Sequence, residues 1–499
     1  MNRISESQFE WLISKSDSIL RKFKGNNFIM GISALHILNS HPDIQKKYLN
    51  IFYKKNLGII FFKYVYLHFY AFLRFVALFF KKGNTRADDI HHNTEILFIS
   101  HLINFDQNLA EDFYFGNLPF YLRKKGFNVT VLLINHIKKK KYINIEIKGC
   151  NFISMPTIFS ISNEWKLYIN SFKHSLYFFL YGLKKADIQS NRFYINVSFN
   201  AISDSTLFAL RTFYIIKNYI KSSKIQTIFL TWEGHAWERL VCASANSSVR
   251  KVKIVGYSFT NLFPSSYALM RPLSVNYNSS FILTSGLVSQ AKISNNIFGS
   301  NTKVLCFGTH KKNVYDIGNI YLKHFNFCLV APEGLAVESY KLFIFAIKVA
   351  LLLPNIKFVF RCHPNLQFSY LQKLYKDLSI LPSNVFISNK KSLIEDFMDC
   401  KWLLYRSSSV AITAVLNGLR PIHYHDEGEL NIDPLYELKR WRVIANSPLE
   451  VVDCIQLDVD RKNNFSEDLD FNEAFTYCNS YFMDVNYSVI NSILKEPIH

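Results

Sequence analysis

Four short polar segments directly follow apolar runs in this sequence. "RCHP" (361–364), "RSSS" (406–409), "PEG" (332–334) and "EGH" (233–235) each come after four to six mostly apolar residues. Imidazole, hydroxyl and carboxylate groups bind phosphate, bind sugar hydroxyls or transfer protons. The spacing therefore predicts chemistry at the ends of buried strands.

His363 is the first candidate among these residues. Pro364 cannot extend a strand ladder and restricts His363 to extended conformations, so the imidazole is aimed away from the sheet. There it can hydrogen-bond a phosphate or donate a proton to a leaving group. A capping role for His363 is the simpler alternative. Arg361 supplies a cation beside it.

Further polar residues of the C-terminal half are expected near His363. Ser407, Ser408 and Ser409 precede a predicted helix, where one serine acts as the N-cap and the others suit phosphate. Glu427 can meet ribose hydroxyls or form a turn. Together these segments predict a nucleotide-phosphate pocket within 304–430, without a P-loop or a G-x-G-x-x-G fingerprint. The remaining residues assigned to this pocket are Gly308, Lys312, Glu333, Gly334 and Pro364.

The N-terminal half carries the candidates for a general base. Glu233 follows the run "TIFLTW" and is well placed to accept a proton, although a carboxylate at a helix start also has a purely electrostatic explanation. Asp106 is the second candidate for the base. His101, His235 and Arg239 are expected to bind the acceptor, beside the aromatic residues of 112–122.

Apolar runs alternate with helical patterns over most of the chain. Such alternation is typical of parallel sheets covered on both faces, and two series of this size predict an α/β protein with two doubly wound, Rossmann-like domains facing a cleft. The predicted parts are a helical extension (1–92), two Rossmann-like domains (93–290 and 291–470) and C-terminal helices that pack back across them (471–499). The predicted strands are 95–100, 128–134, 192–198, 227–232, 253–259, 304–308, 327–331, 357–361, 385–389, 402–406 and 421–425.

Composition limits the setting of this chemistry. The 499 residues carry a formal net charge of +20, which favours an anionic partner. The basic residues are dispersed and no nucleic-acid-binding motif appears, so nucleic acid is not expected to be that partner. The eight cysteines show no C-x-x-C spacing and the N-terminus lacks an apolar signal core. A cytoplasmic location is predicted.

The segment 57–82 is long enough to cross a bilayer but contains Lys63, His68 and Arg74. Lys63, Arg74 and Lys81 fall on one face of a helix, because eleven and eighteen residues are close to whole turns. The segment is therefore expected either to lie on an anionic inner-membrane surface or to be a core helix with snorkelling cations. A true span is the least favoured of the three alternatives.

The "RCHP" and "RSSS" segments resemble the HP and serine motifs of bacterial sialyltransferases, polysialyltransferases and capsule Kdo transferases, which are GT-B glycosyltransferases. "WEG" (232–234) is similar to their acidic-acidic-glycine motif, with Trp232 in place of the first acid. "SHL", "DFYFGNLP", "WEGHAWER" and "APEG" also look like segments of bacterial surface-carbohydrate biosynthesis proteins, and the resemblance spans roughly 95–430.

The resemblance implies inverting, metal-independent transfer of a sialic acid, Kdo or pseudaminic acid type sugar from a CMP donor to a surface glycan or lipid-linked acceptor. It implies no cofactor, Glu233 as the base, His363 as phosphate contact or acid, and Ser407–Ser409 as phosphate binders. Two alternatives keep the fold: a CDP-glycerol phosphotransferase and a transferase that uses a UDP- or GDP-hexose. A further alternative is a non-catalytic membrane scaffold, which would catalyse no transfer reaction.

Overall fold

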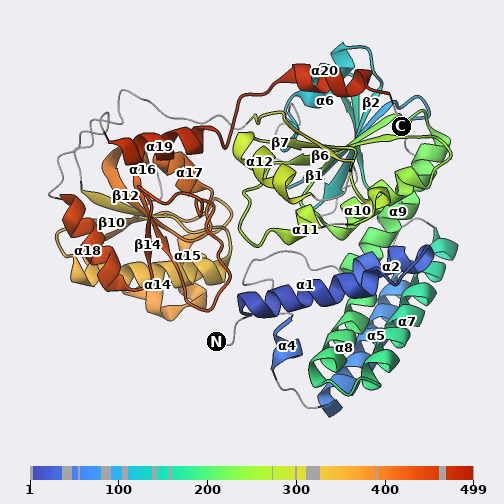
Figure 1. The fold of residues 1–499 in the computed structure, drawn as a ribbon, viewed down its shortest axis with the longest axis horizontal. Helices are drawn as coiled ribbons and strands as arrows, with labels where there is room; N and C mark the ends of the chain where they lie inside the picture. Colours follow the sequence, from blue (N-terminus) through green and yellow to red (C-terminus); the bar gives the residue numbers. More distant parts are fainter. Residues whose placement is uncertain are drawn as a thin grey trace.

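The fold contains two parallel α/β domains and a helical subdomain (Figure 1). The computed structural model describes residues 4–35, 48–53, 57–79, 91–103, 111–137, 143–156, 160–271, 273–297, 301–310, 326–388, 391–459 and 468–497.

The first domain is built on an eight-stranded sheet with the order β3-β4-β2-β1-β5-β6-β7-β8. All neighbours are parallel except β3 and β4. The chain order reverses between β1 and β5, which makes that position the topological switch point, where α/β sheets bind ligands. The strands are β1 (Ile96–Leu102), β2 (Val129–Asn135), β3 (Asn144–Ile147), β4 (Cys150–Ser154), β5 (Thr227–Thr231), β6 (Lys253–Ser258), β7 (Phe281–Thr284) and β8 (Lys303–Cys306).

The strand predicted at 304–308 belongs to this first sheet. It is β8, and its residues pair with β7 from Phe281↔Lys303 to Thr284↔Cys306. The polar segment before it contains helix α12 (Leu287–Asn296), which is the crossover between the two strands and not a domain linker. The predicted boundary at 290/291 therefore falls inside α12, and it assigns β8 to the second domain instead of the first. The reason is that a polar crossover helix resembles a linker in sequence.

The second domain has a six-stranded, wholly parallel sheet with the order β11-β10-β9-β12-β13-β14. Its switch point lies between β9 and β12. Two doubly wound domains were predicted, and the two sheets confirm that architecture. The strands are β9 (Phe327–Val330), β10 (Lys357–Phe360), β11 (Val385–Ile387), β12 (Cys400–Tyr405), β13 (Arg420–Tyr424) and β14 (Val443–Ala445).

Helices cover both sheets, and their apolar faces form the cores. Those of the first domain are α6 (Leu118–Lys124), α10 (Ala236–Asn246), α11 (Tyr267–Met270) and α12. Those of the second domain are α14 (Ala336–Leu352), α15 (Phe368–Leu374), α16 (Leu393–Asp399), α17 (Val410–Leu416), α18 (Pro448–Val459) and α19 (Leu469–Asn479).

The helical subdomain combines the N-terminal extension with helices inserted between β4 and β5 (Figure 1). The strand predicted at 192–198 lies in one of these, α8, whose N-cap Asp187 accepts hydrogen bonds from two backbone N–H groups. Phe193, Val197 and Ala201 are buried at helical spacing, so tertiary packing overrides their β propensity. The helices are α1 (Glu6–Leu20), α2 (Asn26–Ala34), α4 (Leu49–Phe52), α5 (Leu57–Phe79), α7 (Ile161–Leu183), α8 (Ile188–Ala201) and α9 (Asp204–Ser222).

The C-terminal segment joins the two domains. Helix α19 packs on the second domain, whereas α20 (Tyr487–Lys495) returns to the first, where Ile490 and Ile493 are buried in its core (Figure 1). Between them, the Tyr481 hydroxyl donates to the Pro434 carbonyl (3.3 Å) and contacts the backbone of Leu262. Loops that follow β13 and β6 thus meet at Tyr481. The two doubly wound sheets have the GT-B fold that was predicted.

Candidate functional site

The switch point of the second sheet brings three predicted residues together. Glu333 follows β9 and Ser407 follows β12, and the Ser407 Oγ donates a 2.5 Å hydrogen bond to a Glu333 carboxylate oxygen. His363 follows β10, and its ring lies so close to Gly334 that a Cβ added there would be 3.1 Å from Nδ1. His363 and Ser407 are thus linked through the adjacent residues Glu333 and Gly334, and their convergence on one phosphate stays a prediction.

The hydrogen bonding of His363 fixes its tautomer. The Asn365 N–H donates to His363 Nδ1 (3.2 Å), so Nδ1 carries no proton and Nε2 is the donor. Burial lowers the pKa of His363 below its ordinary value, although the Glu333 carboxylate acts in the opposite direction. A neutral imidazole with a free N–H donor can stabilise charge on a leaving phosphate.

The three serines occupy different environments. Ser407 and Ser408 are buried, whereas Ser409 is exposed. The Ser407 hydroxyl donates its hydrogen bond to Glu333, and Ser408 Oγ accepts a long, 3.4 Å hydrogen bond from the Val410 N–H. Ser407 therefore positions a carboxylate, and the binding of phosphate by these serines stays a prediction.

Arg406 forms the buried floor of this site and was not among the predicted site residues. Its guanidinium donates to Glu338 (2.7 Å) and to Glu429 (2.6 Å), and Lys341 also pairs with Glu429. Burial lowers the pKa of Arg406, but the two carboxylates outweigh it and the net shift is upward. Two carboxylates compensate this cation, which leaves it little net charge to offer a ligand.

Five predicted donor-site residues lie elsewhere or remain untested. Arg361 donates to Asp396 (2.6 Å) and to the Lys391 carbonyl, which directs it away from the switch point. Gly308 follows β8 of the first sheet, and its backbone packs against Asp484. Lys312 lies outside the described residues. Glu427 is exposed in the turn after β13, and Pro364 lies in the turn after His363.

The switch point of the first sheet carries a second cluster of polar side chains. His101, near the end of β1, lies with Nε2 3.1 Å from the Thr231 hydroxyl and Nδ1 2.8 Å from His136 Nε2. Burial and the neighbouring His136 lower the pKa of His101 to about 4. His101 is therefore neutral near pH 7. Sequence analysis missed His136, although it follows the apolar run of β2 as the other candidates follow theirs.

Glu233 and His235 form an ion pair beside this cluster. The two side chains are 2.9 Å apart and partly exposed. Burial raises the pKa of Glu233, but the hydrogen bond and charge of His235 outweigh it and the pKa lies below its usual value. Glu233 is thus an ionised carboxylate available to accept a proton. Gly234 between them has a φ of 82°, and a Cβ there would be 2.2 Å from the Ala268 carbonyl.

Glu238 holds the turn that carries Glu233 and His235. Its fully buried carboxylate accepts hydrogen bonds from the backbone N–H groups of Glu233 (3.0 Å) and His235 (2.8 Å) and from the Thr231 hydroxyl (3.3 Å). Burial raises the pKa of Glu238 to about 7. Glu238 is therefore a positioning residue, because it fixes the turn that carries Glu233 and His235.

Arg239, a predicted acceptor-binding residue, lies beneath the turn and is committed to backbone carbonyls. Its guanidinium is buried and donates to the carbonyls of Ala268 (2.8 Å) and Leu269 (2.9 Å) in α11. It also lies 4.5 Å above the Trp232 ring, which is fully buried. Both residues therefore support the turn from beneath.

Aromatic side chains border the first-domain cluster. Trp237 and Tyr114 each contact His101 edge-on, at centroid distances of 5.7 Å and 5.3 Å. Burial, with Glu233 and Asp112 adding to it, raises the pKa of Tyr114, so its hydroxyl stays protonated. Tyr114 belongs to the predicted aromatic segment 112–122. Asp106, the second predicted base, lies outside the described residues.

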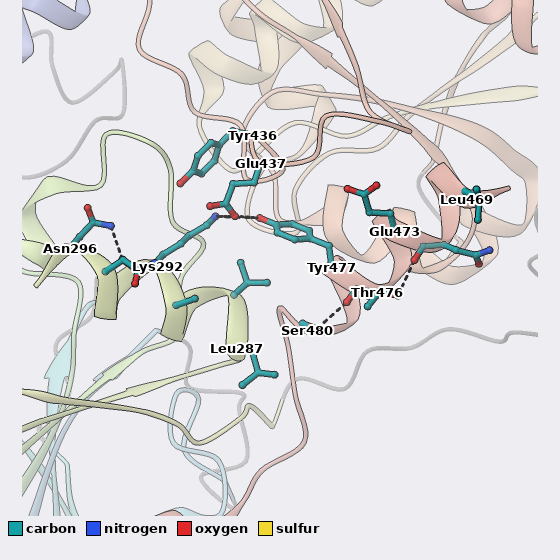
Figure 2. A pocket seen from close by; sticks show the side chains of 14 residues that line it. Leu287, Lys292, Asn296, Tyr436, Glu437, Leu469, Glu473, Thr476, Tyr477 and Ser480 are labelled. Carbon is teal, nitrogen blue, oxygen red and sulfur yellow. Dashed lines mark hydrogen bonds and ion pairs between the residues drawn. The ribbon is translucent and has the colours of Figure 1, made fainter.

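A groove between the domains lies on the side of α12 and α19 (Figure 2). Lys292 of α12 pairs with Glu437 of the second domain (3.2 Å) and lies 4.3 Å above the Tyr436 ring. The Tyr477 hydroxyl donates to the same carboxylate (2.7 Å). These residues connect the domains; the predicted site residues are not among those that line the groove.

Comparisons with known proteins support no assignment by sequence: no family model matches the chain, and no curated protein matches it in sequence. Solved structures with a similar arrangement include trehalose 6-phosphate synthase from Burkholderia multivorans, at 10% identity and a TM-score of 0.45, covering 81% of this chain and 98% of that one.

Two further structures are similar to a comparable degree. UDP-GlcNAc 2-epimerase from Methanocaldococcus jannaschii, in complex with UDP-GlcNAc and UDP, is 10% identical with a TM-score of 0.38, covering 74% of this chain and 94% of that one. HepE from Anabaena, in complex with UDP and glucose, is 12% identical with a TM-score of 0.44, covering 81% of this chain and all of that one. The two sheets themselves define the fold.

Among the described residues, no helix is both long enough and apolar enough to cross a membrane.

Proposed function

We propose that this chain is a glycosyltransferase that moves a sugar from a nucleotide-activated donor to an acceptor hydroxyl. The observation that supports it most is a pair of switch points with complementary chemistry. The second sheet gathers Glu333, His363 and Ser407, and the first gathers His101 and Glu233. The loops beyond both carboxyl edges meet at Tyr481, as a donor site facing an acceptor site requires.

In the proposed transfer reaction, the cluster at each switch point has its own role. Glu233, ionised beside His235, removes the proton from the acceptor hydroxyl as that oxygen attacks the anomeric carbon. The bond from the anomeric carbon to the nucleotide phosphate breaks, and its electron pair stays on the phosphate oxygen. The His363 Nε2–H and the hydroxyls of Ser408 and Ser409 stabilise the charge that develops there. Attack opposite the leaving group inverts the anomeric centre.

The position of Glu333 favours a hexose donor over the ulosonic sugar that the short motifs imply. A 3-deoxy-ulosonic sugar carries its own carboxylate on the anomeric carbon, and Glu333 lies beside the phosphate-binding groups, where it would repel that carboxylate. A hexose presents neutral hydroxyls to the same group. We therefore propose a UDP- or GDP-hexose as donor, with CMP- and CDP-activated donors as the alternatives to test.

Donor preference can be measured in two ways on the full chain. Thermal unfolding with UDP, GDP, CDP and CMP should show a selective shift with a uridine or guanosine nucleotide, because a ligand that binds only the folded state stabilises it. Release of nucleotide from hexose donors, in the presence of a membrane-lipid or glycan extract as acceptor, should depend on Glu233. A shift with CMP alone would replace the hexose proposal by the ulosonic one, and no shift with any nucleotide would contradict both.

A further inference from the structure

Helices α5 and α7 share a large exposed apolar surface, termed here the α5–α7 face. Ring contacts run in opposite order along the two helices, from Tyr64–Phe179 (4.0 Å) through His68–Phe172 (5.2 Å) to Phe75–Trp165 (5.1 Å), so the pair is antiparallel (Figure 1). The large exposed apolar side chains on it are Phe61, Phe62, Val65, Tyr66, Phe69, Tyr70, Phe72, Leu73, Ile161, Trp165, Phe172, Leu176, Tyr177, Leu180 and Leu183.

Helical geometry places both sets of side chains on one side of the pair. On each helix the exposed apolar residues are displaced from the line of contact in the same rotational sense. In antiparallel neighbours that shared sense leads to the same side, so the two sets form one continuous surface. Phe62 is 77% exposed and Phe69 is 59% exposed, which is unusual for so many large side chains in one place.

The charges along the α7 edge of the α5–α7 face are positive, whereas Arg74 of α5 pairs with the exposed Asp204. Lys166, Lys173 and Lys184 are exposed and recur at intervals of seven and eleven residues, which aligns them along one edge of α7. Helix α5 has no acidic residue, and the one carboxylate of α7, Glu164, is buried and paired with Arg211 (2.6 Å). The face therefore suits an anionic partner and disfavours a second copy, which would bring lysines against lysines.

We propose that the α5–α7 face docks on an anionic lipid bilayer, with both helices lying in the plane of the interface. Such a helix buries an apolar stripe in the acyl boundary and holds lysines at the headgroups. Tyr66, Tyr70, Trp165 and Tyr177 match the preference of aromatic side chains for that depth. The inference extends the predicted surface helix at 57–82 to a two-helix platform, and does not depend on the proposed transfer reaction.

Vesicle co-sedimentation of the full chain tests the proposal without any sugar substrate. Binding is expected to vesicles of phosphatidylglycerol and phosphatidylethanolamine and to be much weaker on phosphatidylcholine alone. Phe62→Glu with Phe69→Glu should lower the partition coefficient by more than roughly 10-fold. The matched control is Ile380→Glu with Leu457→Glu, which alters exposed apolar residues of the second domain and should leave binding unchanged.

A second pair of variants tests the charges. Lys166→Gln with Lys173→Gln should lower binding to anionic vesicles by roughly 30-fold, since each lysine near such a surface contributes about 1 kcal/mol. Lys373→Gln with Lys376→Gln in the second domain is the control. Equal loss in the controls, or no binding to anionic vesicles, would overturn the proposal. So would a dimer in solution that the Phe62 and Phe69 variants dissociate, or binding only to native membranes that protease treatment abolishes.

Discussion

Ser407 donates a 2.5 Å hydrogen bond to Glu333 across the switch point of the second sheet, so a hydroxyl from the serine run is committed to a carboxylate. A carboxylate beside a phosphate pocket repels the nucleotide unless it has another task. Binding a sugar hydroxyl is such a task, because an ionised carboxylate is a strong acceptor. Ser407 then positions Glu333 for that contact.

Substitution of Glu333 should therefore separate the sugar from the nucleotide. Glu333→Gln is expected to weaken binding of the intact nucleotide-sugar by roughly 10-fold, the effect of one hydrogen bond to a charged group. Binding of the free nucleotide should be unchanged or tighter, because a repulsive charge is removed. Isothermal titration with both ligands measures the difference. Equal weakening of the two ligands would contradict a role for Glu333 at the sugar.

His363 is expected to contribute mainly to the rate. His363→Ala removes the Nε2–H donor and should lower kcat by roughly 100-fold, the usual effect of losing a donor to a developing charge. His363→Gln retains an N–H donor and should recover part of the loss. Gly334→Ala is a useful companion, because its methyl group would crowd the imidazole at 3.1 Å without removing it. Unchanged kcat in His363→Ala would remove this residue from the mechanism.

Glu233→Gln should abolish most turnover while leaving the donor site intact. The amide cannot accept the acceptor proton, and loss of a general base typically lowers the rate by roughly 10²- to 10⁴-fold. Donor binding should stay within error of the wild type, since Glu233 belongs to the other domain. His101→Gln is the comparison: the neutral His101 imidazole belongs to the same cluster, so a larger loss there would transfer the role of base to the imidazole.

Turnover is expected to persist in excess EDTA. The proposed leaving-group contacts come from His363, Ser408 and Ser409, and such donors stabilise phosphate charge without a metal ion. The measurement is nucleotide release before and after chelation, with added Mg²⁺ and Mn²⁺ as separate arms. Complete loss on chelation, restored by either metal, would contradict metal independence.

Sequence reasoning located both switch points through a rule about parallel strands. Polar residues after apolar runs gather at one edge once the strands are parallel, and this holds for Glu333, His363 and Ser407 without knowledge of their contacts. The rule cannot tell which side chains turn toward the ligand. Arg361 and Arg239 satisfied it, yet each pairs with neighbouring protein groups.

Other features depended on information that the local sequence does not contain. The role of Glu238 depends on the conformation of the turn that precedes it. Its carboxylate accepts hydrogen bonds from Thr231, Glu233 and His235, and only the folded turn brings these three donors to one place. The same holds for the strand at 304–308, whose assignment to the first sheet is decided by its pairing with β7. Pairing partners are a property of the whole fold, and the crossover helix α12 is too polar to reveal them.

Glu238 should make stability depend on pH near neutrality. Its folded-state pKa of about 7 lies above the unfolded value of 4.5, so the folded protein binds the proton more tightly. The contribution of Glu238 to the free energy of unfolding is complete below pH 4.5 and is lost as the pH rises through 7. The loss is about 3 kcal/mol in total. Other groups titrate in the same window, so the informative quantity is the difference in unfolding free energy between wild type and Glu238→Gln, from urea denaturation at pH 5 and pH 8.

The amide of Glu238→Gln is uncharged at both values and its oxygen still accepts hydrogen bonds. The variant is therefore expected to gain about 2.5 kcal/mol relative to wild type between pH 5 and pH 8. Glu238→Ala, which leaves the N–H groups of Glu233 and His235 without their acceptor, should be destabilised at both pH values. A pH-independent difference between wild type and Glu238→Gln would show that the carboxyl is ionised throughout, and that the turn is held by a full charge at neutral pH.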